Sequence, residues 1–301
     1  MPAFSFSLAR LARVTLLAGV AVACGGGERQ VAVDATRDDY GAVVDTLPVA
    51  RRIVSLNPTT TEILFALGAG DRVVGRSRWD QWPDAARAVP EVGDAIRPSI
   101  ERVLAARPDL VVLYAGGDNR DAADALTRAG VRVVALRVDL IADFLRALRL
   151  LGALTATGAA AGTIADSVTA TLDAVRRATP PGAPRPTVFM HVWDNPLMAI
   201  GGGSFMSELV DIAGGRNVYA DHPEPSAAIS FEDLLRRNPD VVLAAPIAAR
   251  ELREAARWQS LPAVRERRVL TYDTTLVARP SVRLGEAARS LATLLHPVGS
   301  R

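Results

Sequence analysis

The sequence contains few of the residues from which metal centres, redox centres and disulfides are built. Its 301 residues include one cysteine, three histidines and no lysine, so every basic residue is arginine. A single cysteine excludes an intrachain disulfide and a cysteine cluster for iron–sulfur chemistry. His191, His222 and His296 are spread over the second half of the chain, whereas a zinc or manganese site needs several histidines and carboxylates together. We therefore expect no metal ion held by protein ligands.

An excess of charge of one sign is also missing. Apart from Arg10 and Arg13 in the N-terminal segment, the chain has 33 basic and 33 acidic residues. This balance argues against a nucleic-acid partner, because binding to phosphates needs an excess of cationic side chains. There is no Gly-x-Ser-x-Gly elbow, no P-loop and no histidine–carboxylate set at catalytic spacing. We expect the protein not to be an enzyme, and we keep an exported enzyme as a less favoured alternative.

Residues 1–23 have the pattern of an export signal. Basic residues precede the apolar stretch Val14–Ala23, which is too short to span a membrane. The run Ala21-Val22-Ala23-Cys24 resembles a bacterial lipobox, in which the cysteine is lipidated and becomes the mature N-terminus. The alternative is an ordinary cleaved signal, after which Cys24 has no role. Residues 24–50 are glycine-rich and then polar, which is typical of a flexible tether and lead-in.

One phrase occurs twice, as Ser99–Val112 and Ser230–Leu243. In each copy a serine that can cap a helix precedes a short helical pattern with a glutamate, Glu101 or Glu232, in its first turn, where a carboxylate suits the positive end of a helix. A Pro-Asp pair then ends the helix, and a short apolar run predicts a buried strand. The copies are too far apart for a solenoid repeat. They predict two similar α/β lobes with a cleft between them.

The rest of the chain fits this plan. With 49% hydrophobic and 23% charged residues, it has the composition and length of a globular protein with two domains. Strands alternate with helices in both halves, which indicates largely parallel, Rossmann-like sheets. We predict an N-terminal lobe over 51–138, a long helical connector over 139–180 and a C-terminal lobe over 181–301. A stiff helical connector favours limited hinge motion.

Several segments together resemble a known family. These are Arg52–Gly68, the Trp/Pro segment that ends at Pro83, Arg107–Val111, Gly214–Val218 and Arg279–Arg283. They resemble the helical-backbone class of periplasmic binding proteins, which deliver vitamin B12, ferric siderophores or haem to ABC importers. Within that class the cobalamin receptors are most similar, through the run from Thr61 to Gly68 and the aromatic pair before Pro83.

The resemblance implies a monomeric, extracytoplasmic receptor, in the periplasm or tethered by lipid to the outer surface of the cell membrane. It implies two partners, a small-molecule ligand and the dimeric permease of an ABC importer. The expected ligand is a corrinoid, and a ferric siderophore or haem is the alternative. Apart from a lipid on Cys24, we expect no covalently bound cofactor.

Aromatic side chains are the main candidates for ligand contact. A broad, rigid ligand is held well by aromatic faces, and Trp79, Trp82 and Trp193 are predicted in loops that follow strands, where α/β proteins bind ligands. Each could instead pack inside its lobe, as we expect for Trp258. Asp273 follows the last strand and could accept hydrogen bonds from a ligand or cap a helix. The predicted ligand contacts are Thr59, Trp79, Trp82, Trp193, Asn195 and Asp273.

The repeated glutamates have a second interpretation. In the family that this chain resembles, one exposed glutamate on each lobe docks into arginine pockets of the permease, and Glu101 and Glu232 match those positions. Each could also do no more than complement a helix dipole. Two other features have open alternatives: His191 as a haem ligand or a core residue, and Gly201–Ser204 as an anion site or a tight turn with a serine cap.

Overall fold

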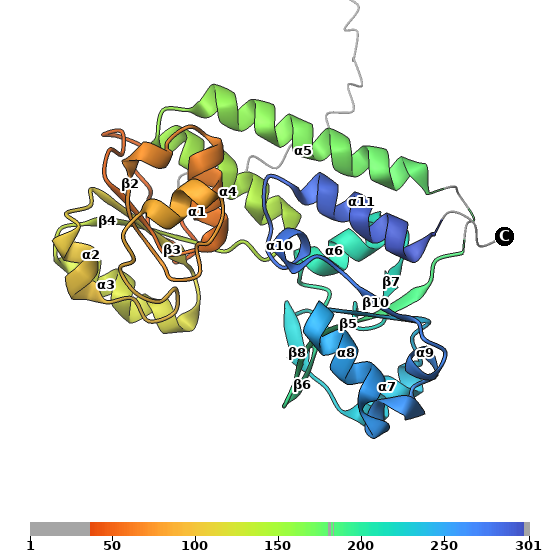
Figure 1. The fold of residues 1–301 in the computed structure, drawn as a ribbon. Helices are drawn as coiled ribbons and strands as arrows, with labels where there is room; N and C mark the ends of the chain where they lie inside the picture. The colour runs from red at the N-terminus through yellow and green to blue at the C-terminus, as the bar shows by residue number, and fades with distance from the viewer. Residues whose placement is uncertain (1–36, 180–181, 183, 298–301) are drawn as a thin grey trace, which may run out of the picture. The chain divides into compact units, whose positions relative to one another are not determined.

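The structure is a computed structural model that describes residues 37–179, 182 and 184–297. The predicted export signal, the predicted lipidation site at Cys24 and most of the tether lie outside the described residues. The described part contains two sheets, one on each side of a helical connector (Figure 1). Elements around the first sheet are called the first lobe, and elements around the second sheet the second lobe. The residue boundaries predicted above stay a prediction.

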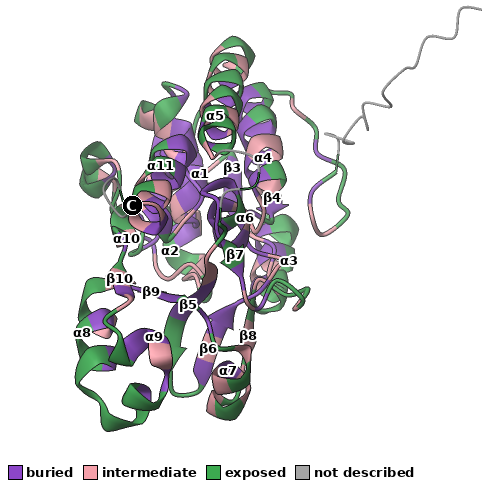
Figure 2. Ribbon diagram, turned by 90° about the vertical axis from the view of Figure 1, so that its right-hand side faces the viewer, coloured by how far each residue is buried: buried purple, intermediate pink, exposed green. Residues whose placement is uncertain are grey.

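The first sheet is fully parallel, with strand order β2-β1-β3-β4. Its strands are β1 (Ile53–Ser55), β2 (Val73–Arg76), β3 (Leu110–Tyr114) and β4 (Arg132–Leu136). The helices of this lobe are α1 (Pro58–Ala66), α2 (Ile100–Ala105), α3 (Arg120–Arg128) and the short 3₁₀ turns η1 (Gly70–Arg72), η2 (Asp84–Ala88) and η3 (Gly117–Asn119). The strands are buried between helical layers, as their near-continuous apolar sequences predict (Figure 2).

The second sheet is mixed, with order β10-β9-β5-β6-β8 and with β7 paired to β5. Its strands are β5 (Thr187–Asp194), β6 (Leu197–Ile200), β7 (Arg216–Asn217), β8 (Ser226–Ala228), β9 (Val241–Ala244) and β10 (Val269–Thr271). β5, β7, β9 and β10 run parallel, whereas β6 and β8 extend the sheet antiparallel. The helices are α6 (Phe205–Ile212), α7 (Phe231–Arg237), α8 (Pro246–Glu254), η4 (Ala256–Ser260), α9 (Pro262–Arg265), α10 (Thr274–Val277) and α11 (Leu284–Leu295).

The repeated phrase forms the same local structure in both lobes. Ser99 Oγ accepts the Arg102 amide at 3.4 Å at the start of α2, and Ser230 Oγ accepts the Asp233 amide at 3.0 Å at the start of α7. The capping prediction is therefore confirmed. The aspartate of each Pro-Asp pair then accepts backbone N–H groups that precede a neighbouring strand: Asp109 from Arg51 and Arg52 before β1, and Asp240 from Thr187 of β5.

Two helices form the connector, α4 (Ile141–Leu154) and α5 (Gly158–Ala178). The 21 residues of α5 lie along both α4 and α11 (Figure 1). Two glycines allow this packing: a Cβ on Gly152 of α4 would lie 2.6 Å from Ala161 Cβ, and one on Gly285 of α11 would lie 2.2 Å from Thr171 Cγ2. A single apolar cluster runs from the first sheet through α4 and α5 to the second sheet. Among the residues that the structure describes, no helix is long and apolar enough to cross a membrane.

Candidate functional site

A cavity of about 240 Å³ lies at the junction of the two lobes. Its walls come from segments that follow β1, β3 and β4 of the first sheet and from the second lobe. The residues that line it are Asn57, Pro58, Thr59, Tyr114, Val138, Asp139, Ser204, Phe205, Pro225, Ala278, Arg279 and Pro280. Because the carboxyl ends of parallel strands gather at one edge of a sheet, this is where an α/β fold places a ligand.

Thr59 reaches this cavity because α1 begins there. Asn57 caps the helix by accepting the Thr59 amide at 2.8 Å, and Pro58 occupies the first helical position, where a missing N–H costs nothing. The Thr59 hydroxyl donates to the Pro280 carbonyl at 2.9 Å. This hydrogen bond links the two lobes, and Thr59 is only 2% exposed. Ligand contact by Thr59 stays a prediction.

Trp79 and Trp82 lie in the loop after β2, and a buried carboxylate between them anchors that loop. Asp80 has no exposed surface and accepts hydrogen bonds at 2.5 Å from the hydroxyls of Ser77 and of Thr61 on α1. Burial raises the pKa of Asp80, against the lowering by these hydrogen bonds. With the loop fixed in this way, Trp79 stays 58% exposed and Trp82 37% exposed.

An ion-pair cluster joins Trp82 to the second lobe. The guanidinium of Arg283 lies 4.6 Å from the centre of the Trp82 ring, and its Nε is 3.8 Å from Glu62 Oε1. Arg279 Nε lies 3.4 Å from Glu62 Oε2. Glu62 is 2% exposed, and burial raises its pKa more than the two arginines lower it.

Trp193 is the corresponding exposed aromatic residue of the second lobe. We expected it in a loop, but β5 continues to Asp194, so Trp193 is near the end of a strand whose hairpin turn contains Asn195. Strand pairing with β6 extends β5 beyond the parallel part of the sheet, which local sequence did not indicate. Trp193 is 63% exposed, and its indole N–H donates to the Asn195 carbonyl at 2.9 Å.

Asp273 lies after β10 and caps α10. Its Oδ1 accepts the amide of Thr275 at 2.8 Å and the hydroxyl of Thr275 at 2.7 Å, and these bonds lower the pKa of Asp273. The helix-cap alternative thus describes its present role. Its contact with a ligand stays a prediction.

Sequence reasoning missed exposed aliphatic residues beside the tryptophans. Ile247 follows β9 and is 71% exposed. In the sheet, β9 lies between β5, which carries Trp193, and β10, which Asp273 follows. Ile96 is 54% exposed. It lies on a loop with Asp94, whose carboxylate forms a 2.9 Å ion pair with Arg78, the residue before Trp79 in the sequence. Position shortly after a strand was the available signal for Ile247, but the only apolar side chains predicted as ligand contacts were aromatic.

The cavity also contains a tyrosine–carboxylate pair that the sequence did not indicate. Tyr114, at the end of β3, donates to Asp139 Oδ1 at 2.8 Å. Burial is the largest cause of a raised pKa for both groups. Asp139 also accepts, through its backbone carbonyl, the amide of Phe205 at 2.5 Å, which connects the start of the connector to α6.

Two of the open alternatives are decided by packing. His191 on β5 is 5% exposed, with its ring edge-on to Phe189 and Trp258, so it is a core residue and Trp258 is too. Within the described part of the chain, its ring nitrogens have no hydrogen-bond partner. Burial lowers the pKa of His191.

The Gly201–Ser204 segment is a tight turn with a cap. Added Cβ atoms on its three glycines would lie 2.0–2.2 Å from carbonyl oxygens of residues 220–224. The amides of Gly201 and Gly202 donate to the carbonyls of Pro225 and His222, and Ser204 Oγ accepts the Met206 amide. Because these donors are already used, the anion-site interpretation is not supported.

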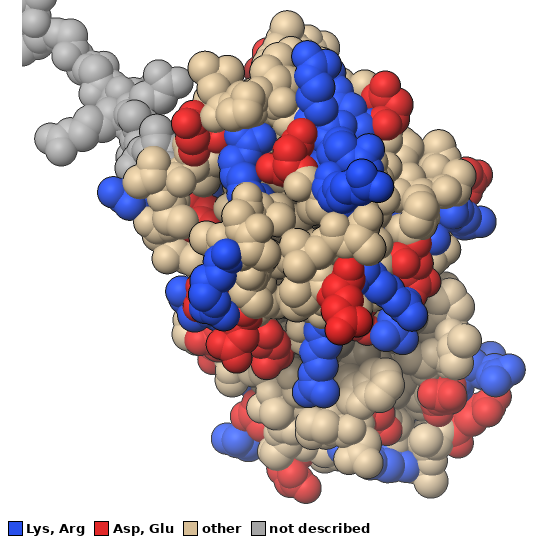
Figure 3. All heavy atoms as spheres, turned by 90° about the vertical axis from the view of Figure 1, so that its left-hand side faces the viewer, with Lys and Arg blue, Asp and Glu red and all other residues tan. Residues whose placement is uncertain are grey.

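Glu101 and Glu232 are both exposed in the first turns of α2 and α7. Within the described part of the chain, neither carboxylate forms a salt bridge. Charges elsewhere are mixed: on the face shown in Figure 3, groups of basic side chains lie next to acidic ones. The two carboxylates lie at equivalent positions of the two lobes, and their docking to a permease stays a prediction.

Residues 53–276 match the profile of a family described as periplasmic binding protein. The chain belongs to this family. The vitamin B12-binding protein of Salmonella typhimurium is 31% identical over 264 residues, which cover 85% of this chain and 96% of that protein. This family membership, together with the two-lobed fold, makes the chain a substrate-binding protein of the ABC-importer class and confirms the predicted fold class.

Solved structures show the same fold with different ligands. The periplasmic vitamin B12 binding protein of Vibrio cholerae superposes with a TM-score of 0.72 at 25% identity, covering 82% of this chain and 96% of that one. A periplasmic haem binding protein of Pseudomonas aeruginosa gives a TM-score of 0.74 at 26% identity, covering 83% and 94%. Fold similarity therefore does not separate corrinoid from haem.

Proposed function

We propose that the protein captures a corrinoid between its two lobes and delivers it to the permease of an ABC importer. The observation that carries this proposal is the exposure of Trp79, after β2, and of Trp193, near the end of β5, at 58% and 63%. Large aromatic side chains seldom remain this exposed without a partner, and their faces suit a broad, rigid macrocycle. The similarity to vitamin B12-binding proteins supports the same ligand.

The charges near the lobe junction favour a ligand without a large net charge. Arg78 is paired with Asp94, and Arg279 and Arg283 share Glu62. A ferric siderophore with several negative charges would need free arginines, because an uncompensated anion is costly to desolvate. A corrinoid, whose rim carries neutral amides, meets hydrogen-bonding groups and aromatic faces without that cost.

Haem is the second candidate, on the strength of Tyr114. A tyrosine oxygen is one of the groups that ligate haem iron, and Tyr114 lines the junction cavity with a carboxylate partner in Asp139. Haem binding through Tyr114 would break the hydrogen bond that it donates to Asp139. A corrinoid makes no such demand on Tyr114.

The proposal includes the tether and the permease. A lipid on Cys24 would hold the receptor at the membrane surface, and the unpaired carboxylates of Glu101 and Glu232 would meet permease arginines, one from each lobe. The receptor would act as a monomer, because each lobe already supplies one contact point.

Titration of the purified protein with cyanocobalamin, haemin and a ferric siderophore tests the ligand. We expect saturable binding of cyanocobalamin by calorimetry, and a loss of about tenfold or more in affinity in Trp79→Ala and in Trp193→Ala. Val43→Ala, which truncates a side chain that is 70% exposed outside the junction, is the matched control and should bind normally. Binding of haemin alone, abolished by Tyr114→Phe, would replace the corrinoid by haem.

A further inference from the structure

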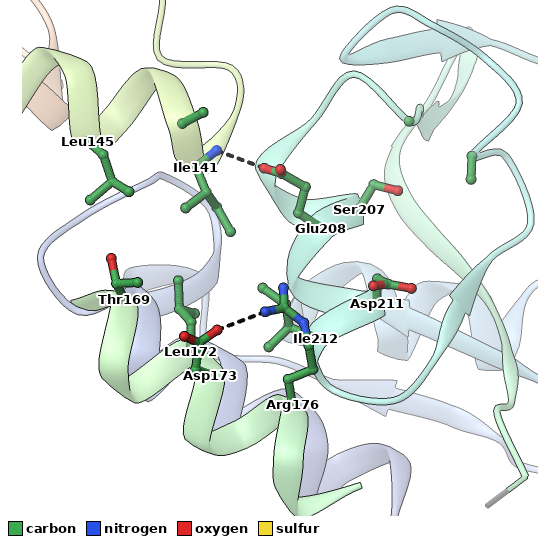
Figure 4. Close-up of a pocket in the computed structure, with 13 residues that line it drawn as sticks. Ile141, Leu145, Thr169, Leu172, Asp173, Arg176, Ser207, Glu208, Asp211 and Ile212 are labelled. Carbon is green, nitrogen blue, oxygen red and sulfur yellow. Dashed lines mark hydrogen bonds and ion pairs between the residues drawn. The ribbon is translucent and has the colours of Figure 1, made fainter. Parts of the chain in front are cut away.

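A second pocket lies apart from the lobe junction, where the connector meets α6 (Figure 4). Its volume is about 560 Å³, within the range of small-molecule sites. Its walls come from α4, α5 and α6 and from Gly202 and Ala220 of the second lobe, and it shares no lining residue with the junction cavity. A molecule bound here would contact both the connector and the second lobe without contacting the residues proposed to hold the transported ligand.

One wall of this pocket is apolar. Ile141 from α4, Leu172 from α5 and Ile212 from α6 form it together with Leu145, and the first three are at most 9% exposed. Side chains from three helices converge on this wall, as Figure 4 shows. An occupant with an apolar body would cover this wall and gain the free energy of removing its own surface from water.

The charged groups of the pocket are compensated, with one exception. Asp173 is paired with Arg176 of the same helix at 2.9 Å, and Asp211 with Arg185 at 2.5 Å. Glu208 forms no salt bridge within the described residues. Its Oε2 accepts only the amide of Ile141, at 2.7 Å, at the start of α4. Burial raises the pKa of Glu208 more than the Ile141 amide and the more distant charge of Arg176 lower it.

The neutral polar groups of the pocket are already engaged. Ser207 Oγ accepts a hydrogen bond from Asn217 at 3.0 Å, and the Thr169 hydroxyl donates to the Ala165 carbonyl at 2.8 Å. Glu208 is therefore the group through which the pocket can select a ligand by charge. An anion would be repelled by Glu208, and a neutral apolar molecule would leave this carboxylate desolvated and unpaired.

We propose that this pocket binds an organic monocation with a compact apolar body, whose ammonium group pairs with Glu208 while the body packs against Ile141, Leu172 and Ile212. The site is independent of the corrinoid proposal. It combines one charge-assisted contact, which sets the orientation, with an apolar wall that provides most of the buried area.

Three probes of similar size and different charge test the site by calorimetry: 2-phenylethylammonium, 2-phenylethanol and 3-phenylpropanoate. We expect the ammonium to bind at least tenfold more tightly than either analogue. Glu208→Gln keeps an oxygen for the Ile141 amide but removes the charge, and should weaken ammonium binding roughly tenfold or more. Ala142→Phe, at an exposed rim position on α4, should block the pocket.

Two controls make the result specific. Glu254→Gln, at an exposed position of α8 outside the pocket, should leave ammonium binding unchanged. Trp79→Ala should also leave it unchanged, whereas a loss there would show that the ammonium binds an exposed aromatic face instead. Equal binding of the three probes, absence of ammonium binding at millimolar concentration, or an unaltered affinity in Glu208→Gln would each overturn the proposal.

Discussion

Glu62 on α1 and Arg279 of the second lobe form an ion pair across the lobe junction, with Arg279 Nε 3.4 Å from Glu62 Oε2. Thr61, the residue before Glu62, donates a hydrogen bond from its hydroxyl to the buried Asp80, in the loop that follows β2. Helix α1 therefore connects the loop that carries Trp79 and Trp82 to the segment that joins the second lobe. A change at this ion pair should affect both the stability of the junction and the position of the loop.

Glu62→Gln should destabilise the protein, because it leaves Arg279 and Arg283 partly buried without an anion. Since both arginines keep some contact with water, we expect a loss of about 1–3 kcal/mol rather than the full cost of breaking a fully buried pair. Urea unfolding measures it. Asp84→Asn, on an exposed carboxylate with an exposed arginine partner, is the control and should cost less than about 0.5 kcal/mol. Equal costs for the two variants would refute the structural role of the junction pair.

Glu101→Ala and Glu232→Ala should lower ligand uptake by cells while the affinity of the purified protein for its ligand stays the same. Each bidentate pair with a permease arginine contributes about 1.5–3 kcal/mol, so one substitution should reduce uptake roughly tenfold. Uptake of labelled ligand and calorimetry are measured side by side, with Glu254→Ala as the exposed control. A parallel loss of affinity would place these glutamates in the ligand site instead.

Gly285→Ala should destabilise the packing of α11 on α5 by about 1–3 kcal/mol, because the added Cβ would overlap Thr171. Thr171→Ala removes the nearest obstructing atom, Cγ2, but keeps Cβ at 2.6 Å, so it should restore only part of the loss in the double variant. Gly162→Ala is the matched control: it lies on α5 with nothing within 4 Å of the added Cβ, and should be neutral or stabilising. Thermal unfolding of the four variants provides the comparison.

The contribution of His191 to stability should fall as the pH drops below about 6.5. Burial lowers the pKa of His191 below its unfolded value of 6.5, more than Asp194 and Glu251 raise it. The unfolded chain then binds more protons in this window, so protonation favours unfolding. The free energy of unfolding is measured in urea between pH 7.5 and 5 for wild type and for His191→Leu. The difference between the two proteins separates the contribution of His191 from that of the buried carboxylates. A difference that does not change with pH would contradict it.

Local signals were sufficient for much of the fold. Ser99 and Ser230 cap their helices as expected, and two helices, α4 and α5, form the connector. These features depend on residues a few positions apart, whose geometry the backbone itself restricts. The antiparallel extension by β6 and β8 was not predicted, because strand direction is decided by pairing partners that lie far apart in the sequence.

For the site, the sequence by itself determined which residues were candidates, and the tertiary structure decided how they are used. The tryptophans near strand ends and the glutamates in the first turns of α2 and α7 follow from residue type and local position. Residue type and local position do not indicate the ion pair between Glu62 and Arg279, the hydrogen bond from the Thr59 hydroxyl to the Pro280 carbonyl, or the exposure of Ile247. They do not indicate the pocket around Glu208 either. These depend on contacts between residues brought together by packing across the connector, for which no sequence period or motif provides a signal.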